Sequence, residues 1–186
     1  MVTDSLFLAP NTLTHRAIGP KSTATFCVNW AKLIDGDRAG ASLFRDQSAY
    51  IGIHKDDGNV NLVYVDNLKI APIGEAVGWK NGRPVSKDWT VVSNGTIKEE
   101  TAVTHERLWL RINANVAAAC VDGYEKRARQ ATFEYSFDGN TFTQLGPSFT
   151  LTNLPIGFVG YRFAVFNFAT KAPGGQLAVE YCDISQ

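Results

Sequence analysis

The chain has 186 residues, enough for one domain and too few for a multidomain enzyme. Its 18 Lys and Arg residues balance 18 Asp and Glu residues, and this zero net charge argues against nucleic acid and against a membrane surface as partners. With 45% hydrophobic residues, 16 Gly and one Met, the composition predicts a globular, β-rich protein.

Short runs that alternate apolar and polar residues follow one another along the chain, and turn residues separate them. In chain order they include 23–30, 61–65, 107–112, 132–137 and 159–168. The only segment of helical composition, 115–131, is interrupted by Asp122-Gly123 and holds at most one helical turn. About ten to twelve short strands with little helix predict an all-β fold, a two-sheet antiparallel β-sandwich or jelly roll over residues 1–186.

Six Asx-Gly pairs mark the expected turns between strands. Such a pair tolerates positive φ at both central residues, as a type I′ hairpin requires. The pairs are Asp35-Gly36, Asp57-Gly58, Asn81-Gly82, Asn94-Gly95, Asp122-Gly123 and Asp138-Gly139.

Two of the predicted strands indicate how the faces divide. In 107–112, strict alternation predicts that Leu108, Leu110 and Ile112 face the core. Arg107, Trp109 and Arg111 then form the opposite face. The strand 159–168 is apolar on both faces, which is typical of a strand that is covered on both sides.

Motifs for several common chemistries are missing. The histidines His15, His54 and His105 are widely spaced and have no cysteine pairs beside them, so no zinc site of local spacing is predicted. The chain also lacks a phosphate-binding loop and a Gly-x-Ser-x-Gly nucleophile elbow. A glycanase would need two facing carboxyl groups, for which Glu134 and Glu180 are the strand candidates.

Acidic residues cluster at two of the expected turns. Asp35-Gly36-Asp37 and Asp56-Asp57-Gly58 offer the oxygen ligands that calcium prefers. The same residues are common turn formers, and we interpret them so. We therefore expect no cofactor and no metal site, with a structural calcium as the alternative.

Three cysteines, Cys27, Cys120 and Cys182, cannot form a disulfide framework because they allow at most one bridge. We expect each to be a small buried apolar residue, with a Cys27–Cys182 bridge as the alternative. Residues 1–10 lack the basic and long apolar regions of a secretory signal, and no stretch approaches membrane-spanning length. We interpret the chain as a mature domain or an excised fragment.

The segment 72–95 combines Trp79 and Trp89 with glycine, proline and polar residues, the composition of a long loop or irregular hairpin. Indole faces stack on the apolar faces of sugar rings while nearby polar groups form hydrogen bonds with the sugar hydroxyls. Trp79 and Trp89 are therefore candidate ligand-binding residues. The alternative is that they fold over the end of the sandwich as a lid. Trp109 with Arg111 is a second candidate platform for a sugar ring. The alternative is that Trp109 is buried under a loop.

Four segments carry a resemblance to a known family. They are Asn11–Pro20, Asp35–Gly52, Ala131–Gly139 and Gly160–Lys171, followed by Gly174-Gly175. In this order they resemble the C-terminal β-sandwich of glycoside hydrolase family 43 β-xylosidases and α-L-arabinofuranosidases, and they extend over nearly the whole chain.

This resemblance implies a concanavalin A-like sandwich without catalytic residues, because catalysis in the family belongs to a separate β-propeller. It implies a domain that packs on the propeller, contributes to its active-site rim and in some members binds xylan. Tyr50, within one of the motifs, and Phe158, just before the Gly160 strand, are further candidate ligand-binding residues. The resemblance implies a further strand upstream of Asn11, and we expect this first strand to be missing or supplied otherwise.

The sequence therefore predicts a non-catalytic module that binds xylan or arabinoxylan and accompanies a family 43 catalytic domain. The alternative is a structural domain that completes the propeller's active-site rim without binding sugar itself. A polysaccharide partner favours secretion, although the sequence leaves the localisation open. If the chain is secreted, Asn94-Gly95-Thr96 is a glycosylation sequon.

Overall fold

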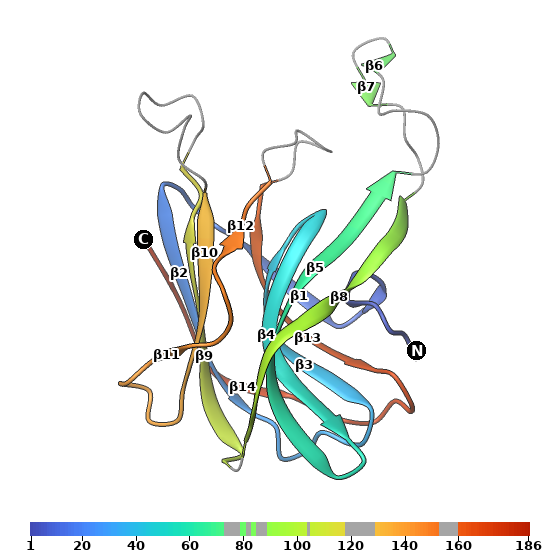
Figure 1. The fold of residues 1–186 in the computed structure, drawn as a ribbon, viewed down its shortest axis with the longest axis vertical. Helices are drawn as coiled ribbons and strands as arrows, with labels where there is room; N and C mark the ends of the chain where they lie inside the picture. Colours follow the sequence, from blue (N-terminus) through green and yellow to red (C-terminus); the bar gives the residue numbers. More distant parts are fainter. Residues whose placement is uncertain (73–78, 81–82, 85–88, 104, 118–128, 153–159) are drawn as a thin grey trace.

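Two antiparallel β-sheets face each other in the computed structural model (Figure 1). The structure describes residues 1–72, 79–80, 83–84, 89–103, 105–117, 129–152 and 160–186. In this part of the chain the only helical element is a 3-10 turn, η1 (Leu6–Leu8). The predicted all-β, two-sheet fold is confirmed.

The first sheet contains six strands in the described residues. Their order across the sheet is β1 (Thr12–Arg16), β13 (Arg162–Ala169), β3 (Asp37–Phe44), β4 (Gln47–Asp56), β5 (Asn59–Pro72) and β8 (Trp89–Ala102). Every neighbouring pair is antiparallel.

The second sheet is built mostly from the two ends and the middle of the chain. Its order is β11 (Thr143–Gln144), β10 (Gln130–Ser136), β9 (Arg107–Asn115), β2 (Lys21–Asn29) and β14 (Ala178–Ser185). The short β12 (Phe149–Thr150) also pairs with β10, and β6 (Trp79–Lys80) pairs separately with β7 (Arg83–Pro84). The predicted strands 23–30, 107–112 and 132–137 correspond to β2, β9 and β10.

The main hydrophobic core lies between the two sheets. Phe133 of β10 and Tyr64 of β5 meet there with ring centroids 5.2 Å apart, and both side chains are completely buried. Leu108, Leu110 and Ile112 of β9 are also completely buried, so their predicted inward orientation is confirmed.

A second, smaller apolar cluster covers the other face of the first sheet. Phe166 and Phe168 of β13 pack there with Leu6 and Ala9, which come from the N-terminal segment. Phe163 of the same strand points into the main core. β13 is therefore apolar on both faces because both faces are covered, as the sequence predicts.

The Asx-Gly pairs do not all form turns between strands. Asp57 and Gly58 have φ values of 49° and 83° and join β4 to β5, which confirms the predicted type I′ turn. The turn predicted at Asn94-Gly95 is wrong, since both residues lie inside β8. Gly95 has φ of 96°, and a Cβ there would lie 2.6 Å from a Val65 methyl carbon, so glycine serves a close strand contact.

The cysteine expectations are met only in part. Cys27 is completely buried, as expected, but Cys182 is exposed on the edge strand β14. Both are free thiols, so the alternative of a bridge between them is wrong. The remaining cysteine at position 120, and most of the helix-like segment 115–131, lie outside the described residues.

Candidate functional site

Trp109 lies on the outer face of the second sheet, where alternation along β9 predicts it. The side chain is half-buried. The Arg107 guanidinium carbon lies 5.0 Å from the centroid of the indole ring, in cation–π contact. The predicted Trp109 platform is therefore partly occupied by its own neighbour.

A turn between β10 and β11 also packs on the indole. The Asp138 carboxylate accepts bonds from the backbone N–H groups of Asn140 and Thr141, both at 2.8 Å, and these bonds lower the pKa of Asp138 to about 2. The turn brings Gly139 so near that a Cβ there would lie 2.9 Å from the Trp109 ring. This is the geometry of the alternative, an aromatic ring held under a loop.

Arg111 is held on the same outer face by two contacts. Its Nε atom donates to the Thr25 hydroxyl at 3.1 Å, and its guanidinium carbon lies 3.4 Å from the centroid of the Phe142 ring. These contacts fix the orientation of the guanidinium group. Its role toward a ligand remains a prediction.

The two candidate carboxylates for glycanase chemistry are far apart. Glu134 lies on β10 and Glu180 on β14, with β9 and β2 between them. Three strand spacings separate them by roughly 14 Å, whereas paired carboxylates in glycosidases lie about 5–9.5 Å apart. Glu180 is also paired with Arg107 at 2.7 Å. This pair is therefore unsuited to glycoside hydrolysis.

Trp89 lies at the beginning of β8, opposite Pro72 of β5, and 42% of its surface is exposed. The connections from β5 to β8, from β9 to β10 and from β12 to β13 leave the sheets at the same end of the sandwich, which we call the loop end (Figure 1). Trp79 belongs to the β6–β7 hairpin, which comes from the loop joining β5 and β8. The Trp79 side chain and Phe158 lie outside the described residues.

Tyr50 of β4 is only 4% exposed and packs edge-on against Phe166, with ring centroids 5.0 Å apart. Its hydroxyl lies 2.9 Å from Nε2 of His54. It therefore belongs to the small cluster on the outer side of the first sheet, at the wall of a cavity there.

The acidic turns considered for calcium are joined by a lysine. Lys171 Nζ lies 2.7 Å from an oxygen of Asp35 and 2.9 Å from one of Asp57. This ammonium group lowers the pKa of the Asp35 carboxyl and compensates part of the charge that would attract a cation. In the described residues no group of three His, Cys, Asp or Glu side chains is placed to hold a metal ion.

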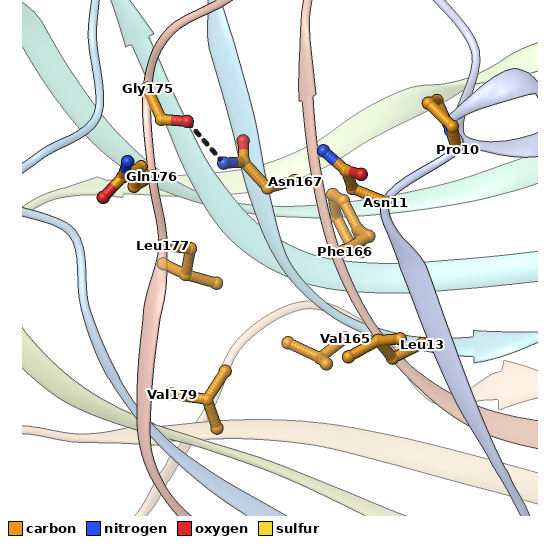
Figure 2. Close-up of a pocket in the computed structure, with 10 residues that line it drawn as sticks. All are labelled: Pro10, Asn11, Leu13, Val165, Phe166, Asn167, Gly175, Gln176, Leu177 and Val179. Carbon is orange, nitrogen blue, oxygen red and sulfur yellow. Dashed lines mark hydrogen bonds between the residues drawn. The ribbon is translucent and has the colours of Figure 1, made fainter.

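A groove of about 400 Å³ opens between the edges of the two sheets (Figure 2). β1 and β13 form one wall, and the segment leading into β14 forms the other. Leu13, Val165, Leu177 and Val179 supply apolar surface. The amides of Asn11, Asn167 and Gln176 supply polar groups, and the Asn167 amide donates to the Gly175 carbonyl at 3.1 Å.

The sequence did not predict this groove. Asn11 and Asn167 occur in the motifs that carry the family resemblance, but nothing in the local pattern marks them as neighbours. They approach because β1 pairs with β13, with Thr12 opposite Phe166. That pairing joins residues more than 150 positions apart and is a consequence of the tertiary fold.

This arrangement of two facing antiparallel sheets is that of a concanavalin A-like sandwich. Residues 3–185 match the beta xylosidase C-terminal concanavalin A-like domain. The chain belongs to this family, as the sequence motifs indicated. No curated protein matches the chain.

Solved structures of family 43 enzymes share the fold. One is an engineered family 43 glycoside hydrolase with endo-xylanase and exo-arabinofuranosidase activity, 39% identical, with a TM-score of 0.86, and the match covers 100% of this chain and 33% of that one. A bifunctional GH43-CE protein from Bacteroides eggerthii is 24% identical over 100% of this chain and 20% of its own, with a TM-score of 0.77. Xylan beta-1,4-xylosidase from Bacillus halodurans is 10% identical over 94% and 29%, with a TM-score of 0.65.

The chain thus spans a third or less of the length of these enzymes. It corresponds to the beta xylosidase C-terminal domain, which is non-catalytic in family 43 enzymes. No helical segment in the described part of the chain has the length and apolar character of a membrane span.

Proposed function

We propose that this domain is a carbohydrate-binding module of a hemicellulose-degrading family 43 enzyme and that its ligand is xylan or arabinoxylan. The observation that carries the proposal is the exposure of Trp89 at the loop end of the sandwich. An indole that is 42% exposed offers apolar surface to water, and a sugar ring can cover this surface by stacking. The β6–β7 hairpin adds Trp79 to the same connection.

Charge and ancestry support the same ligand class. A chain with zero net charge has no long-range attraction for polyanions, so an uncharged polysaccharide suits it. The 39% identical relative is described as having endo-xylanase and exo-arabinofuranosidase activity. Arabinoxylan is a substrate for both activities, and a binding module would hold the catalytic domain near such a chain.

Replacing Trp89 with alanine is expected to weaken binding of xylohexaose and soluble arabinoxylan about tenfold or more, because a stacking aromatic residue often dominates a small interface. Trp79→Ala is expected to act in the same direction. Isothermal titration calorimetry and affinity electrophoresis measure the effect.

Tyr181→Ala is the matched control, since Tyr181 is a similarly exposed aromatic residue, 53% exposed, on the edge strand of the second sheet. It should leave the affinity unchanged. The proposed function would be contradicted if the wild type bound neither xylohexaose nor arabinoxylan. Equal affinities of the wild type and both tryptophan variants would also contradict it.

The second candidate function is structural, a domain that packs on a family 43 catalytic domain and completes its active-site rim. It is favoured by the exposed apolar side chains beside the groove of Figure 2. Leu13 is 74% exposed and Val179 is 43% exposed. The 39% identical relative is three times as long as this chain, so the remaining two thirds of such an enzyme are available to cover this surface.

If this surface packs on the catalytic domain, Leu13→Asp combined with Val179→Asp should abolish association with the separately produced catalytic part of the 39% identical relative. Analytical ultracentrifugation of the mixture measures association. Val92→Asp is the control, because Val92 is 55% exposed on β8 at the opposite edge of the first sheet. Association that survives the double substitution would rule out this surface as the contact.

A further inference from the structure

A second cavity, of about 270 Å³, lies on the outer side of the first sheet. It is formed by residues from the N-terminal segment, from β3, β4, β5 and β8, and from the end of β13. They are Asp4, Arg38, Tyr50, His54, Val65, Asn94, Gly95, Ile97, Phe168 and Thr170. None of them belongs to the groove of Figure 2, and Trp89 is not among them.

The wall on β4 carries a polar pair, a buried Tyr50 and a half-buried His54. Tyr50 and His54 point to the same face of the strand, and Gly52 between them adds no side chain. The Tyr50 hydroxyl lies 2.9 Å from Nε2 of His54. Burial lowers the pKa of His54 to about 3 and raises that of Tyr50, so both groups are uncharged at neutral pH.

The cavity carries charged groups of both signs. Arg38 is largely buried and makes a salt bridge of 2.9 Å with Asp56, so its charge is already compensated. Asp4 in the N-terminal segment adds an exposed carboxylate. An anionic ligand would be repelled by Asp4 and would compete with Asp56 for Arg38, while a cationic ligand would lie beside the Arg38 guanidinium group.

The remaining lining combines hydrogen-bonding groups with apolar surface. Asn94 is exposed and offers an amide, and the Thr170 hydroxyl, which donates to the Gly36 carbonyl at 2.8 Å, can still accept a bond. Ile97 is 47% exposed and, with Val65 and Phe168, forms the apolar part of the wall. Donors, acceptors and apolar carbon thus face one small space.

We propose that this cavity is a binding site for a single uncharged sugar ring, such as a pentose unit of a hemicellulose side chain. Sugar hydroxyls both donate and accept, so they can bond the Asn94 amide and the Thr170 hydroxyl, while the C–H groups of the ring contact Ile97. The cavity is slightly smaller than the ~300 Å³ at which typical small-molecule sites begin, so it suits one ring rather than a chain. This site is separate from the loop end and does not depend on xylan binding there.

The experiment uses the whole 186-residue chain, produced in a bacterial host so that the sequon at Asn94 carries no glycan. The chain is titrated with D-xylose, L-arabinose and D-glucuronate, and the amide resonances in two-dimensional NMR spectra are followed. Saturable shifts with one or both pentoses, confined to residues of this cavity, are expected. Glucuronate should bind more weakly than the pentoses.

Asn94→Ala should weaken pentose binding about threefold to tenfold, the effect of losing one hydrogen bond. Ile97→Trp, which enlarges a lining side chain that is 47% exposed, should abolish it. Asn59→Ala, an exposed asparagine in the β4–β5 hairpin, is the control for Asn94→Ala and should leave the affinity unchanged.

Absence of saturable pentose binding, or binding that Ile97→Trp leaves intact, would overturn the proposal. Tighter binding of glucuronate than of either pentose would overturn the assignment of an uncharged ligand. Trp89→Ala is included as well and should not alter pentose binding at this cavity, so failure here and failure of xylan binding at the loop end are distinguishable.

Discussion

Replacing Phe133 with alanine is expected to lower the free energy of unfolding by about 3–5 kcal/mol, the cost of a large cavity in a packed core. Phe133 is completely buried at the centre of β10. Its ring meets that of Tyr64 from the opposite sheet, with centroids 5.2 Å apart. The substitution therefore removes contact between the sheets as well as apolar burial.

Urea denaturation followed by fluorescence measures this loss as a fall in the midpoint concentration. Phe137→Ala is the matched control, because Phe137 follows the same strand but is 40% exposed. Its loss should cost less than about 1 kcal/mol. Similar midpoints for the two variants would show that Phe133 does not join the sheets energetically.

Gly146→Ala is expected to destabilise the protein by about 2–5 kcal/mol, because two penalties add there. Gly146 has φ of 77°, where an alanine costs roughly 1–2 kcal/mol. A Cβ atom would also lie 2.1 Å from a carbon of the buried Tyr64 ring. Overpacking of this kind costs typically about 1–3 kcal/mol.

Gly58→Ala separates the two penalties. Gly58 has φ of 83°, close to that of Gly146, but a Cβ there has no atom within 4 Å. Only the backbone cost, roughly 1–2 kcal/mol, should remain. Thermal and urea unfolding of the two variants give the difference. Equal stability of the two variants would mean that the Tyr64 ring moves aside at no cost.

Where local alternation was strong, the sequence alone was sufficient. The inward side of β9 and the coverage of β13 on both faces followed from the order of apolar residues, since side chains alternate strictly along a strand. The turn at Asp57-Gly58 followed from a backbone requirement of two adjacent residues. Each of these features depends on neighbours in the chain.

Where the outcome depends on a neighbouring strand, local reasoning was insufficient. Asn94-Gly95 has the composition of a turn, but β5 lies beside it and extends the pairing through it. Cys182 has the usual preference for burial, but it occupies an edge strand whose surface is open in this chain. In both cases tertiary context outweighed the preference of the residue.

The candidate sites also depend partly on the sequence and partly on the tertiary fold. Trp89 and Tyr50 could be selected from composition and family motifs, but their exposures of 42% and 4% come from the fold. The cavity beside Tyr50 joins segments from Asp4 to Thr170, and only the packed sheet brings them together.

The all-β class, the inward face of β9 and the family could be derived from the chain alone, because alternation and motif order are local properties. The neighbours of each strand, and with them the groove between the sheet edges and the polar cavity on the first sheet, follow only from the packed fold. This is because a strand's backbone hydrogen bonds pair with any partner of suitable register. The choice among partners is made by burial of both sheets at once.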